Sequence, residues 1–155
     1  MGNNDKILSR FLNLHDEMCE IKKTKQLKLR SQDLMLLKRK MGKNLQIIIS
    51  ELDGIDVAGC AILISKQKAY YLYAAANETG RKHDSSNGMV WFLIEYLVKN
   101  GFEELDTSGV DPYKFWGGYN FKKRFSTYPV EYVGEWEYCS NKLLRMIINI
   151  ALLKN

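Results

Sequence analysis

The fold of this chain is decided by the stretch Leu45-Gln-Ile-Ile-Ile-Ser-Glu-Leu-Asp-Gly-Ile-Asp-Val-Ala-Gly-Cys-Ala-Ile-Leu-Ile-Ser65. It holds two β-type runs, residues 45–51 and 55–65, joined by a turn that contains Asp53-Gly54. An Asp-Gly pair between two such runs is a strong signal for a tight hairpin. A third run, Ala69-Tyr-Tyr-Leu-Tyr-Ala-Ala-Ala76, follows soon after, and strand alternation predicts that Tyr71 and Tyr73 share one face. The sequence therefore predicts three strands in an antiparallel meander.

Two amphipathic helices are predicted before the meander. From Lys6 to about Glu20, apolar residues recur at helical spacing and form one stripe, made of Ile7, Leu8, Phe11, Leu14 and Met18. Residues 31–40 predict a second helix, whose inward side chains are Leu34, Leu37 and Met41.

The span from Lys22 to Lys43 is strongly basic. It carries nine Lys or Arg residues against a single acid, Asp33. Such a charge run is either a solvated helix face or the footprint of a polyanion such as tRNA.

A third helix and a fourth strand are predicted after the meander. The polar loop 77–88 leads into residues 89–99, which are apolar nearly all round and predict a helix buried on most sides. Gly101 ends this helix, and residues 102–110 predict a buried strand that finishes in small polar residues. A meander, a helix and a further strand predict an α+β or α/β sandwich. Open α/β sheets bind ligands at such strand ends.

The segment Gly117-Gly-Tyr-Asn-Phe-Lys-Lys-Arg-Phe125 is the strongest candidate for a functional site. Its Gly-Gly pair allows positive φ angles and the close approach of another molecule. Phe121 and Phe125 lie four residues apart, so on a helical turn they share an inward face and leave the cations 122–124 outside. Three adjacent cations suit an anionic partner.

Two further elements are predicted towards the C-terminus. Residues 128–136 alternate as a strand, with Val130, Tyr132 or Val133, and Trp136 available to the core. Residues 141–155 predict a helix whose apolar surface exceeds what one packing face needs. This extra surface suits burial, a partner interface or peripheral membrane contact.

Length and composition indicate one globular domain over residues 1–155. Hydrophobic residues make up 46% and charged residues 26% of the chain, and the net charge of +5 favours an anionic partner. No signal peptide is recognised at the start of the chain.

Cysteine and histidine usage indicates a cytoplasmic protein without a metal centre. Cys19, Cys60 and Cys139 lack metal-ligand spacing and are expected to be reduced thiols. With only His15 and His83 in the chain, a multi-histidine metal site is excluded.

The order of the segments is itself a signature. The order begins with Tyr70-Tyr-Leu-Tyr-Ala-Ala-Ala76, a polar loop and an apolar helix. It continues with Asn-Gly-Phe and a strand ending in Leu-Asp-Thr-Ser-Gly. It ends with Gly118-Tyr-Asn-Phe-Lys-Lys-Arg-Phe125 and Val130-Glu-Tyr-Val-Gly-Glu135. From about Phe11 to Trp136, the chain resembles the Fem family, the aminoacyl-tRNA-dependent transferases that build peptidoglycan interpeptide bridges. The resemblance implies the GNAT acyltransferase fold, here a single α+β (α/β/α) domain with a mixed, mostly antiparallel sheet and helices on both faces.

The resemblance also implies roles for residues. Phe121-Lys122 matches the family's Phe-Lys pair, so Lys122 is expected to stabilise the anion of the tetrahedral intermediate or to contact the tRNA end, and Phe121 to shape the pocket. Leu105-Asp106 and Gly109 match the family's Asp-containing strand end. The attacking amine also releases a proton, and Asp106 and Tyr73 are candidates to accept it if the strands bring them to one cleft, with solvent or substrate as the alternative.

The expected site therefore has two kinds of residue. Lys122 and Asp106 are the expected catalytic residues. The expected substrate-binding residues are Phe121, Tyr73, Arg124 and Gly118. His83, Cys60 and Cys139 are weaker candidates, because none of them has a partner that the sequence reveals.

Three functions stay open from the sequence. The first is aminoacyl transfer from aminoacyl-tRNA, without a cofactor, to an amine of a cell-envelope precursor or similar acceptor. The second is acyl-CoA-dependent N-acetylation of an amino sugar or small amine. Residues 78–84 lack the glycine pattern that holds the CoA pyrophosphate, although Ser85, Ser86 and a helix N-terminus still suit an anion. The third is a non-catalytic domain that binds RNA or a partner.

Domain number sets this chain apart from the family it resembles. Fem members usually carry two GNAT-like domains, and this chain has room for one. A homodimer or a second Fem-like subunit is one way to restore the pair.

Overall fold

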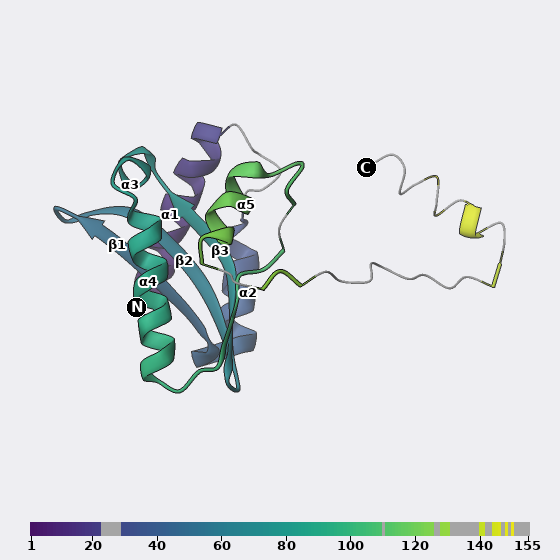
Figure 1. Ribbon diagram of the computed structural model, residues 1–155, viewed down its shortest axis with the longest axis horizontal. Helices are drawn as coiled ribbons and strands as arrows, with labels where there is room; N and C mark the ends of the chain where they lie inside the picture. The colour runs from purple at the N-terminus through teal and green to yellow at the C-terminus, as the bar shows by residue number, and fades with distance from the viewer. Residues whose placement is uncertain are drawn as a thin grey trace.

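A computed structural model of the chain (Figure 1) describes residues 1–22, 29–109, 111–125, 128–130, 140–141, 144–146, 148 and 150. Its elements follow one another as α1 (Asp5–Lys22), α2 (Ser31–Met41), the 3-10 helix η2 (Gly42–Asn44), β1 (Leu45–Leu52), β2 (Ile55–Ser65), β3 (Lys68–Ala76), α3 (Glu78–Lys82), α4 (Ser85–Lys99), β4 (Glu104–Asp106) and α5 (Trp116–Lys123).

The described strands form one mixed sheet in the order β1-β2-β3-β4. β1 pairs with β2, and β2 with β3, in antiparallel fashion, so the predicted meander is confirmed. Asp53 and Gly54 have positive φ angles of 51° and 78°, as the two central residues of the predicted hairpin turn require. β4 then pairs with β3 in parallel, after the chain has crossed over through α4.

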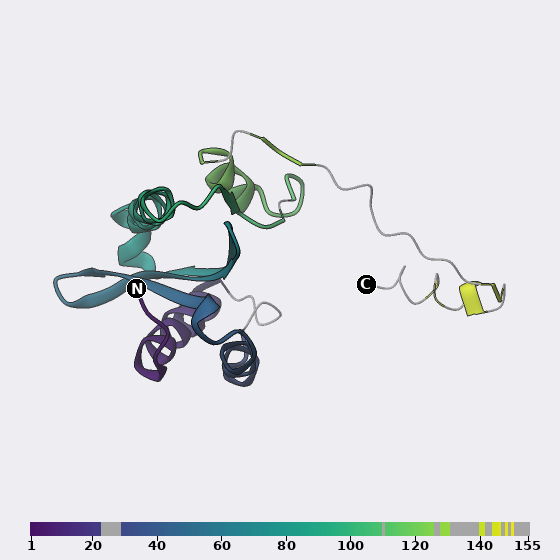
Figure 2. The same ribbon diagram turned by 90° about the horizontal axis from the view of Figure 1, so that it is seen from below.

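Helices cover both faces of the sheet, as predicted (Figure 2). α1 and α2 lie on one face, because apolar residues three and four apart turn one side of each helix towards the strands. α4 lies on the other face, together with α5. Two hydrophobic cores result, one on each side of the sheet. The first contains Leu8, Phe11, Leu14 and Leu34, and the second contains Met89, Val90, Leu93 and Leu97.

One of the three residues predicted to face inward from α2 does not do so. Leu34 is fully buried and Leu37 is partly buried against the first core. Met41 is 37% exposed, because α2 ends there and Gly42, with a φ of 53°, turns the chain away.

α4 is less buried than its composition predicts. It begins at Ser85 and turns its apolar residues in all directions. Trp91, Phe92 and Val98 are 56%, 49% and 71% exposed, so the prediction of a helix buried on most sides is wrong. Since α4 lies in the outer layer, described elements cover mainly the side that faces the sheet.

The predicted strand 102–110 is shortened to the three residues of β4, and none of them is fully buried. The prediction of a long buried strand is therefore wrong. The carboxylate of Asp106 explains the early end, because its Oδ1 accepts a 2.7 Å hydrogen bond from the backbone N–H of Ser108. Such a side-chain contact favours a turn over continued pairing.

The polar loop 77–88 contains the short helix α3, which the sequence pattern does not indicate. Asn77 begins it, and its side-chain Oδ1 accepts a 2.9 Å hydrogen bond from the backbone N–H of Gly80. Gly80 lies so close to β2 that an added Cβ atom would stand 2.0 Å from the carbonyl oxygen of Val57.

The predicted strand 128–136 is described only over residues 128–130, which form no strand. Val130 was predicted to be available to the core, and this is wrong, because it is 73% exposed and pairs with no described strand. Residues 131–139, with the other predicted core residues, lie outside the described part of the chain.

Much of the predicted helix 141–155 also lies outside the described residues. Within it, residues 144–146, 148 and 150 are helical. Of the helices that the structure describes, none combines the length and the apolar composition needed to cross a membrane.

Candidate active site

β3 and β4 separate soon after they meet. They pair only from Lys68 to Tyr70 on β3. Beyond this pairing, Ser108 links the two segments, because its Oγ donates a 2.6 Å hydrogen bond to the carbonyl oxygen of Tyr71. Ser108 has a left-handed φ of 64°, which turns the chain out of the sheet. The end of β4 is thus an ordered turn beside the point where the two strands diverge.

Lys122 reaches this turn from α5. Its Nζ donates hydrogen bonds of 2.8 Å to the carbonyl oxygen of Gly109 and 3.4 Å to that of Ser108. Burial lowers the pKa of the Lys122 ammonium, and the charge of Asp106 partly opposes this shift. An ammonium has three N–H donors, so one remains for a ligand after these two contacts.

Two phenylalanines hold α5 in place. Phe121 and Phe125 pack against the core under α4, and their ring centroids lie 5.4 Å apart. Phe125 also meets Trp91 of α4 edge to face, at 5.9 Å. The predicted shared inward face is confirmed. The prediction that residue 122 points outward is wrong, whereas Lys123 and Arg124 are exposed as predicted.

The Gly-Gly pair has a different conformation from the predicted one. Gly117 and Gly118 lie in the first turn of α5, and neither has a positive φ. A Cβ atom at Gly118 would meet no atom within 4 Å. The positive φ that glycine allows is therefore not used here, and the two glycines leave open space beside the helix.

Tyr73 does not join Asp106 as expected. A β-bulge at Leu72 breaks the alternation of β3, so that Tyr71 packs in the core under α4 while Tyr73 pairs with Ala61 of the other core. The predicted placement of Tyr71 and Tyr73 on one face is therefore wrong. Asp106 lies beside Tyr70 in the register and is partly buried.

Sequence reasoning missed two features of this site. The first is that the carbonyl oxygens of Ser108 and Gly109 accept hydrogen bonds from Lys122. No pattern of residue types in the sequence indicates such backbone contacts. The second is Tyr71, whose buried hydroxyl has no hydrogen-bond partner among the described residues. Burial raises the pKa of this hydroxyl, so Tyr71 keeps its proton.

Of the weaker candidates, the structure describes His83 and Cys60. His83 is exposed at the end of α3. Cys60 is fully buried in β2, and burial raises the pKa of its thiol to about 12, which disfavours the reactive thiolate. Cys139 lies outside the described residues. Within the described part of the chain, no three His, Cys, Asp or Glu side chains gather as a metal site.

Residues 3–152 match the model of the FemAB family. This chain belongs to the FemAB family. The resemblance expected from the order of its segments is confirmed, and the matched region includes both β4 and the Phe121-Lys122 pair.

Relatives of this FemAB chain include staphylococcal proteins named lipid II:glycine glycyltransferase. The chain is 30% identical over 140 residues to that of Staphylococcus epidermidis, an alignment that covers 87% of this chain and 30% of the relative. It is 32% identical over 101 residues to that of Staphylococcus saprophyticus, covering 62% of this chain and 24% of the relative. The FemAB chain thus spans less than a third of the length of these relatives.

Solved structures of GNAT acetyltransferases share the fold of this FemAB chain. An aminoglycoside acetyltransferase from an uncultured soil metagenomic sample superposes with a TM-score of 0.64 at 15% identity, over 91% of this chain and 93% of that one. The ribosomal-protein-S18-alanine N-acetyltransferase of Escherichia coli gives 0.59 at 10% identity, over 79% and 74%. The predicted fold class is confirmed, and at such identities the likeness concerns the fold alone.

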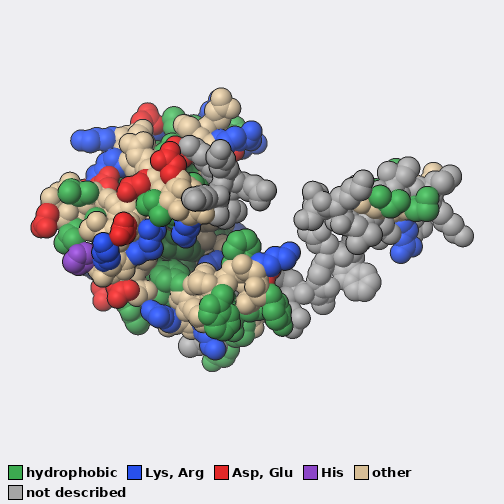
Figure 3. Space-filling model, turned by 90° about the horizontal axis from the view of Figure 1, so that it is seen from above, with side chains coloured by type: hydrophobic (Ala, Val, Ile, Leu, Met, Phe, Trp, Pro, Cys, Tyr) green, Lys and Arg blue, Asp and Glu red, His purple; other side chains and the backbone are tan. Residues whose placement is uncertain are grey.

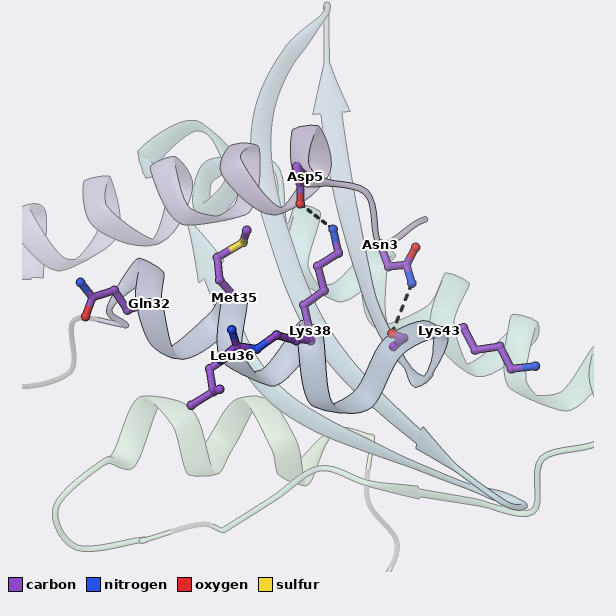
Figure 4. A pocket seen from close by; sticks show the side chains of 9 residues that line it. Asn3, Asp5, Gln32, Met35, Leu36, Lys38 and Lys43 are labelled. Atoms are coloured by element: carbon purple, nitrogen blue, oxygen red, sulfur yellow. Dashed lines mark hydrogen bonds and ion pairs between the residues drawn. The ribbon is translucent and has the colours of Figure 1, made fainter.

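A second polar surface of the FemAB chain lies over α2. An open hollow of about 610 Å³ there is lined by residues that include Lys38, Arg39 and Lys43. Figure 4 shows Lys38 pointing towards Asp5, with which it forms a 2.5 Å ion pair. Arg39, Lys40 and Lys43 are exposed. The basic span 22–43 therefore has exposed cations in and just after α2, whereas the charge of Lys38 is balanced by Asp5.

Proposed function

We propose that this chain is an N-acyltransferase that moves an aminoacyl group from aminoacyl-tRNA to an amine of a cell-envelope precursor. The observation that carries the proposal is the Lys122 ammonium, held at the turn after β4 where β3 and β4 separate. Membership of the FemAB family and the names of the relatives support the same type of reaction.

Lys122 supplies the positive charge that this chemistry needs. The amine attacks the ester carbonyl carbon, a C–N bond forms, and negative charge develops on the carbonyl oxygen. A preorganised cation in a partly dry site stabilises that oxyanion. The C–O bond to the tRNA then breaks, and the ribose oxygen leaves as a hydroxyl once it has gained a proton, which balances the proton that the amine loses. The two carbonyl contacts of Lys122 orient its ammonium before substrate arrives.

Asp106 is the group of this chain that we assign to the released proton, with solvent as the alternative. Its carboxylate lies at the end of β4, close enough to Lys122 to influence the pKa of that lysine. Its Oδ1 is positioned by the backbone N–H of Ser108. Tyr73 pairs on the other side of the sheet, so it is a weaker candidate for this step.

Substrate binding is assigned to groups around the same turn. Phe121 forms part of the wall beside Lys122, and Arg124 adds an exposed charge for a phosphate. The open space beside Gly118 lets a substrate approach the backbone of α5. Tyr73, which is 38% exposed, remains a proposed contact for a part of the substrate that crosses the edge of the sheet.

The exposed cations of α2 suit the body of a tRNA. Each phosphate contact made by Arg39, Lys40 or Lys43 would add to the salt dependence of donor binding. We expect the triple variant Arg39→Gln, Lys40→Gln, Lys43→Gln to bind tRNA more weakly and with a smaller salt slope. Lys38 is left in place because its ion pair with Asp5 joins α2 to α1.

The acceptor side is proposed to use a second GNAT-like unit, supplied by a second copy of this chain or by a Fem-like subunit. The described residues form one such unit, and the alignments cover 30% or less of the relatives. The proposed reaction needs no cofactor beyond the tRNA-linked donor, and it is proposed to occur in the cytoplasm, where charged tRNA is present.

Donor transfer tests the proposal. The purified chain would be incubated with extracted envelope precursors and either radiolabelled aminoacyl-tRNA or radiolabelled acetyl-CoA. Label that moves from aminoacyl-tRNA into an amide supports the proposal. Transfer from acetyl-CoA alone would establish the acyl-CoA-dependent alternative instead, and tRNA binding without any amide product would establish a non-catalytic RNA-binding domain.

A further inference from the structure

Three aromatic rings stand out from the surface just before and at the start of α5. Tyr113, Phe115 and Trp116 are 94%, 57% and 62% exposed. The segment that carries them is ordered by Asp111, whose Oδ1 accepts backbone hydrogen bonds from Tyr113 and Lys114 at 2.9 Å and 2.8 Å. These rings are thus held in the solvent by a defined turn, at the cost of exposing large apolar surfaces.

A stack of side chains, here called the ladder, runs along one side of α5 and consists of Trp116, Tyr119 and Lys123. The ring of Trp116 stacks on that of Tyr119, with centroids 5.7 Å apart and an angle of 29° between the planes. The ammonium of Lys123 lies 5.8 Å from the centroid of the same Tyr119 ring. A planar ligand that stacks on the exposed side of Trp116 would extend this ladder by one step.

Positive charge surrounds the ladder. Residues 111–125 carry four cations, Lys114, Lys122, Lys123 and Arg124, against the single carboxylate of Asp111. The two backbone N–H groups lower the pKa of Asp111 and already occupy one of its oxygens. In Figure 3, hydrophobic and basic side chains lie together over this part of the surface.

We propose that this surface, defined as Tyr113, Lys114, Phe115, Trp116, Tyr119 and Lys123, binds an unpaired polynucleotide strand by stacking on its bases and pairing with its phosphates. The inference rests on the proposed function, for which the acylated end of a tRNA would have to reach Lys122. Tyr119 precedes Lys122 by three residues on the same helix, so a strand stacked on the ladder would have its end beside the reacting group.

Ring chemistry favours an unpaired strand over a duplex or a membrane. Bases in a duplex stack on each other, so few of their faces are open to protein rings, whereas every unpaired base offers one. A membrane-binding face usually adds aliphatic side chains such as Leu to its aromatic residues. Residues 111–125 contain no Leu, Ile, Val or Met, and every large apolar side chain among them is a planar ring.

Binding of labelled RNA to the full chain tests the inference without any transfer reaction. Fluorescence anisotropy would compare a single strand of about eight nucleotides, an abasic strand of equal length and a duplex of the same sequence. We expect the intact single strand to bind more tightly than either of the others. The abasic strand keeps the phosphates, so the difference between it and the intact strand isolates stacking.

Variants then locate the stacking. Since base stacking on one ring is worth about 1–3 kcal/mol, Trp116→Ala should weaken binding of the intact strand by roughly 5- to 140-fold. It should leave binding of the abasic strand nearly unchanged, and Trp116→Phe should restore most of the affinity. Phe92→Ala removes a ring of α4 that is 49% exposed, against 62% for Trp116, and serves as the matched control, with no loss expected.

The outcomes separate this inference from the proposed function. Loss of RNA binding in Trp116→Ala together with no amide transfer by the wild type would support the surface and reject the proposed reaction. Amide transfer by the wild type, together with unchanged RNA binding in Trp116→Ala, would overturn the proposed RNA-binding surface and leave the proposed reaction in place. Equal affinity for intact and abasic strands, preferential binding to vesicles of anionic lipid, or self-association of the chain that Trp116→Ala abolishes would each overturn the inference.

Discussion

At the scale of single residues, Lys122 is distinguished by its setting from the exposed lysines that the structure describes. Its ammonium contacts two backbone carbonyl oxygens in a partly buried position, and the charge of Asp106 acts on it. Burial disfavours the charged form, and the carboxylate of Asp106 favours it. The residue can therefore stabilise an oxyanion only up to a pH below the usual lysine value.

The pH dependence of transfer should reveal this setting. Lys122 must be charged to act, and burial lowers its pKa, so the alkaline decline in kcat should occur below the usual lysine pKa of about 10.4. Asp106→Asn removes the opposing charge, so the decline should move to still lower pH. Rates would be normalised to each variant's own maximum, because Asp106 is also a proposed proton acceptor. An unmoved alkaline decline in Asp106→Asn would contradict the assignment of that decline to Lys122.

Residue spacing predicted part of the geometry around Lys122. Phe121 and Phe125 share the inward face that their spacing indicates, whereas the same pattern wrongly placed Lys122 outward. Lys122 contacts the backbone carbonyl oxygens of Ser108 and Gly109, and backbone atoms are the same in every residue type. These contacts therefore can be found only from the structure. The face predicted for Tyr73 was wrong because a bulge at Leu72 shifts the alternation of side chains along β3. No residue type near Leu72 indicates a bulge.

At the scale of elements, two glycines in helices differ in what surrounds them. Gly80 of α3 packs against the backbone of Val57, whereas Gly118 of α5 faces open space. Gly80→Ala should lower the free energy of unfolding by about 3 kcal/mol, because a Cβ atom would overlap the Val57 carbonyl oxygen. Gly118→Ala should raise it by roughly 0.5–1 kcal/mol, since alanine favours helix. Urea titration of both variants measures these changes.

The same pair also probes the site. If a substrate approaches the backbone at Gly118, the Ala variant should be more stable and yet show a higher KM. A Gly118→Ala variant with unchanged KM would remove this glycine from the proposed binding site.

Arg10 joins α1 to the β1–β2 hairpin through Glu51 and Asp56. Its Nε donates a 2.8 Å hydrogen bond to Asp56 Oδ2, and its Nη2 contacts both carboxylates. This hydrogen bond lowers the pKa of Asp56. Asp56→Asn should reduce the free energy of unfolding at neutral pH by about 1–2 kcal/mol, a value that allows for partial exposure of both partners.

The difference between wild type and Asp56→Asn should depend on pH with a defined sign. The stabilisation by a carboxylate with a lowered pKa is complete above its usual value of about 3.9 and is lost as the pH falls through the folded-state value. The two unfolding energies should therefore converge in acid, as denaturant titrations at several pH values would show. Glu20→Gln changes an exposed carboxylate of α1 and should have little effect. A gap that stays constant down to the lowest pH would contradict this account.

Predictions of elements were right where a local pattern determines the outcome. The Asp53-Gly54 turn and the three strands follow from turn chemistry and β-type runs. β4 and α4 were less well predicted, because a hydrogen bond from the Ser108 backbone ends β4, and the outer layer leaves Trp91 exposed. The exposure of α4 depends on elements that lie apart in the sequence, whereas the turn after β4 depends on one local choice of Asp106 between continued strand pairing and a hydrogen bond two residues on.

At the scale of the whole molecule, the fold and the family membership both indicate an acyltransferase. The described part forms a mixed sheet between two layers of helices, and solved acetyltransferases superpose on it over most of its length. The alignments with its FemAB relatives cover 24% and 30% of those relatives. The central claim is that this GNAT-like unit, with Lys122 at its strand ends, supplies the cation that the reaction needs.

The most direct measurement of this claim is kcat for amide formation by Lys122→Ala at saturating aminoacyl-tRNA. Loss of one preorganised donor costs on the order of a hundredfold or more, so we expect a fall of at least that size. Lys99→Ala removes an exposed lysine at the end of α4 and should retain the wild-type rate, and circular dichroism would establish that both variants are folded. A folded Lys122→Ala chain that transfers the aminoacyl group at the wild-type rate would contradict the account.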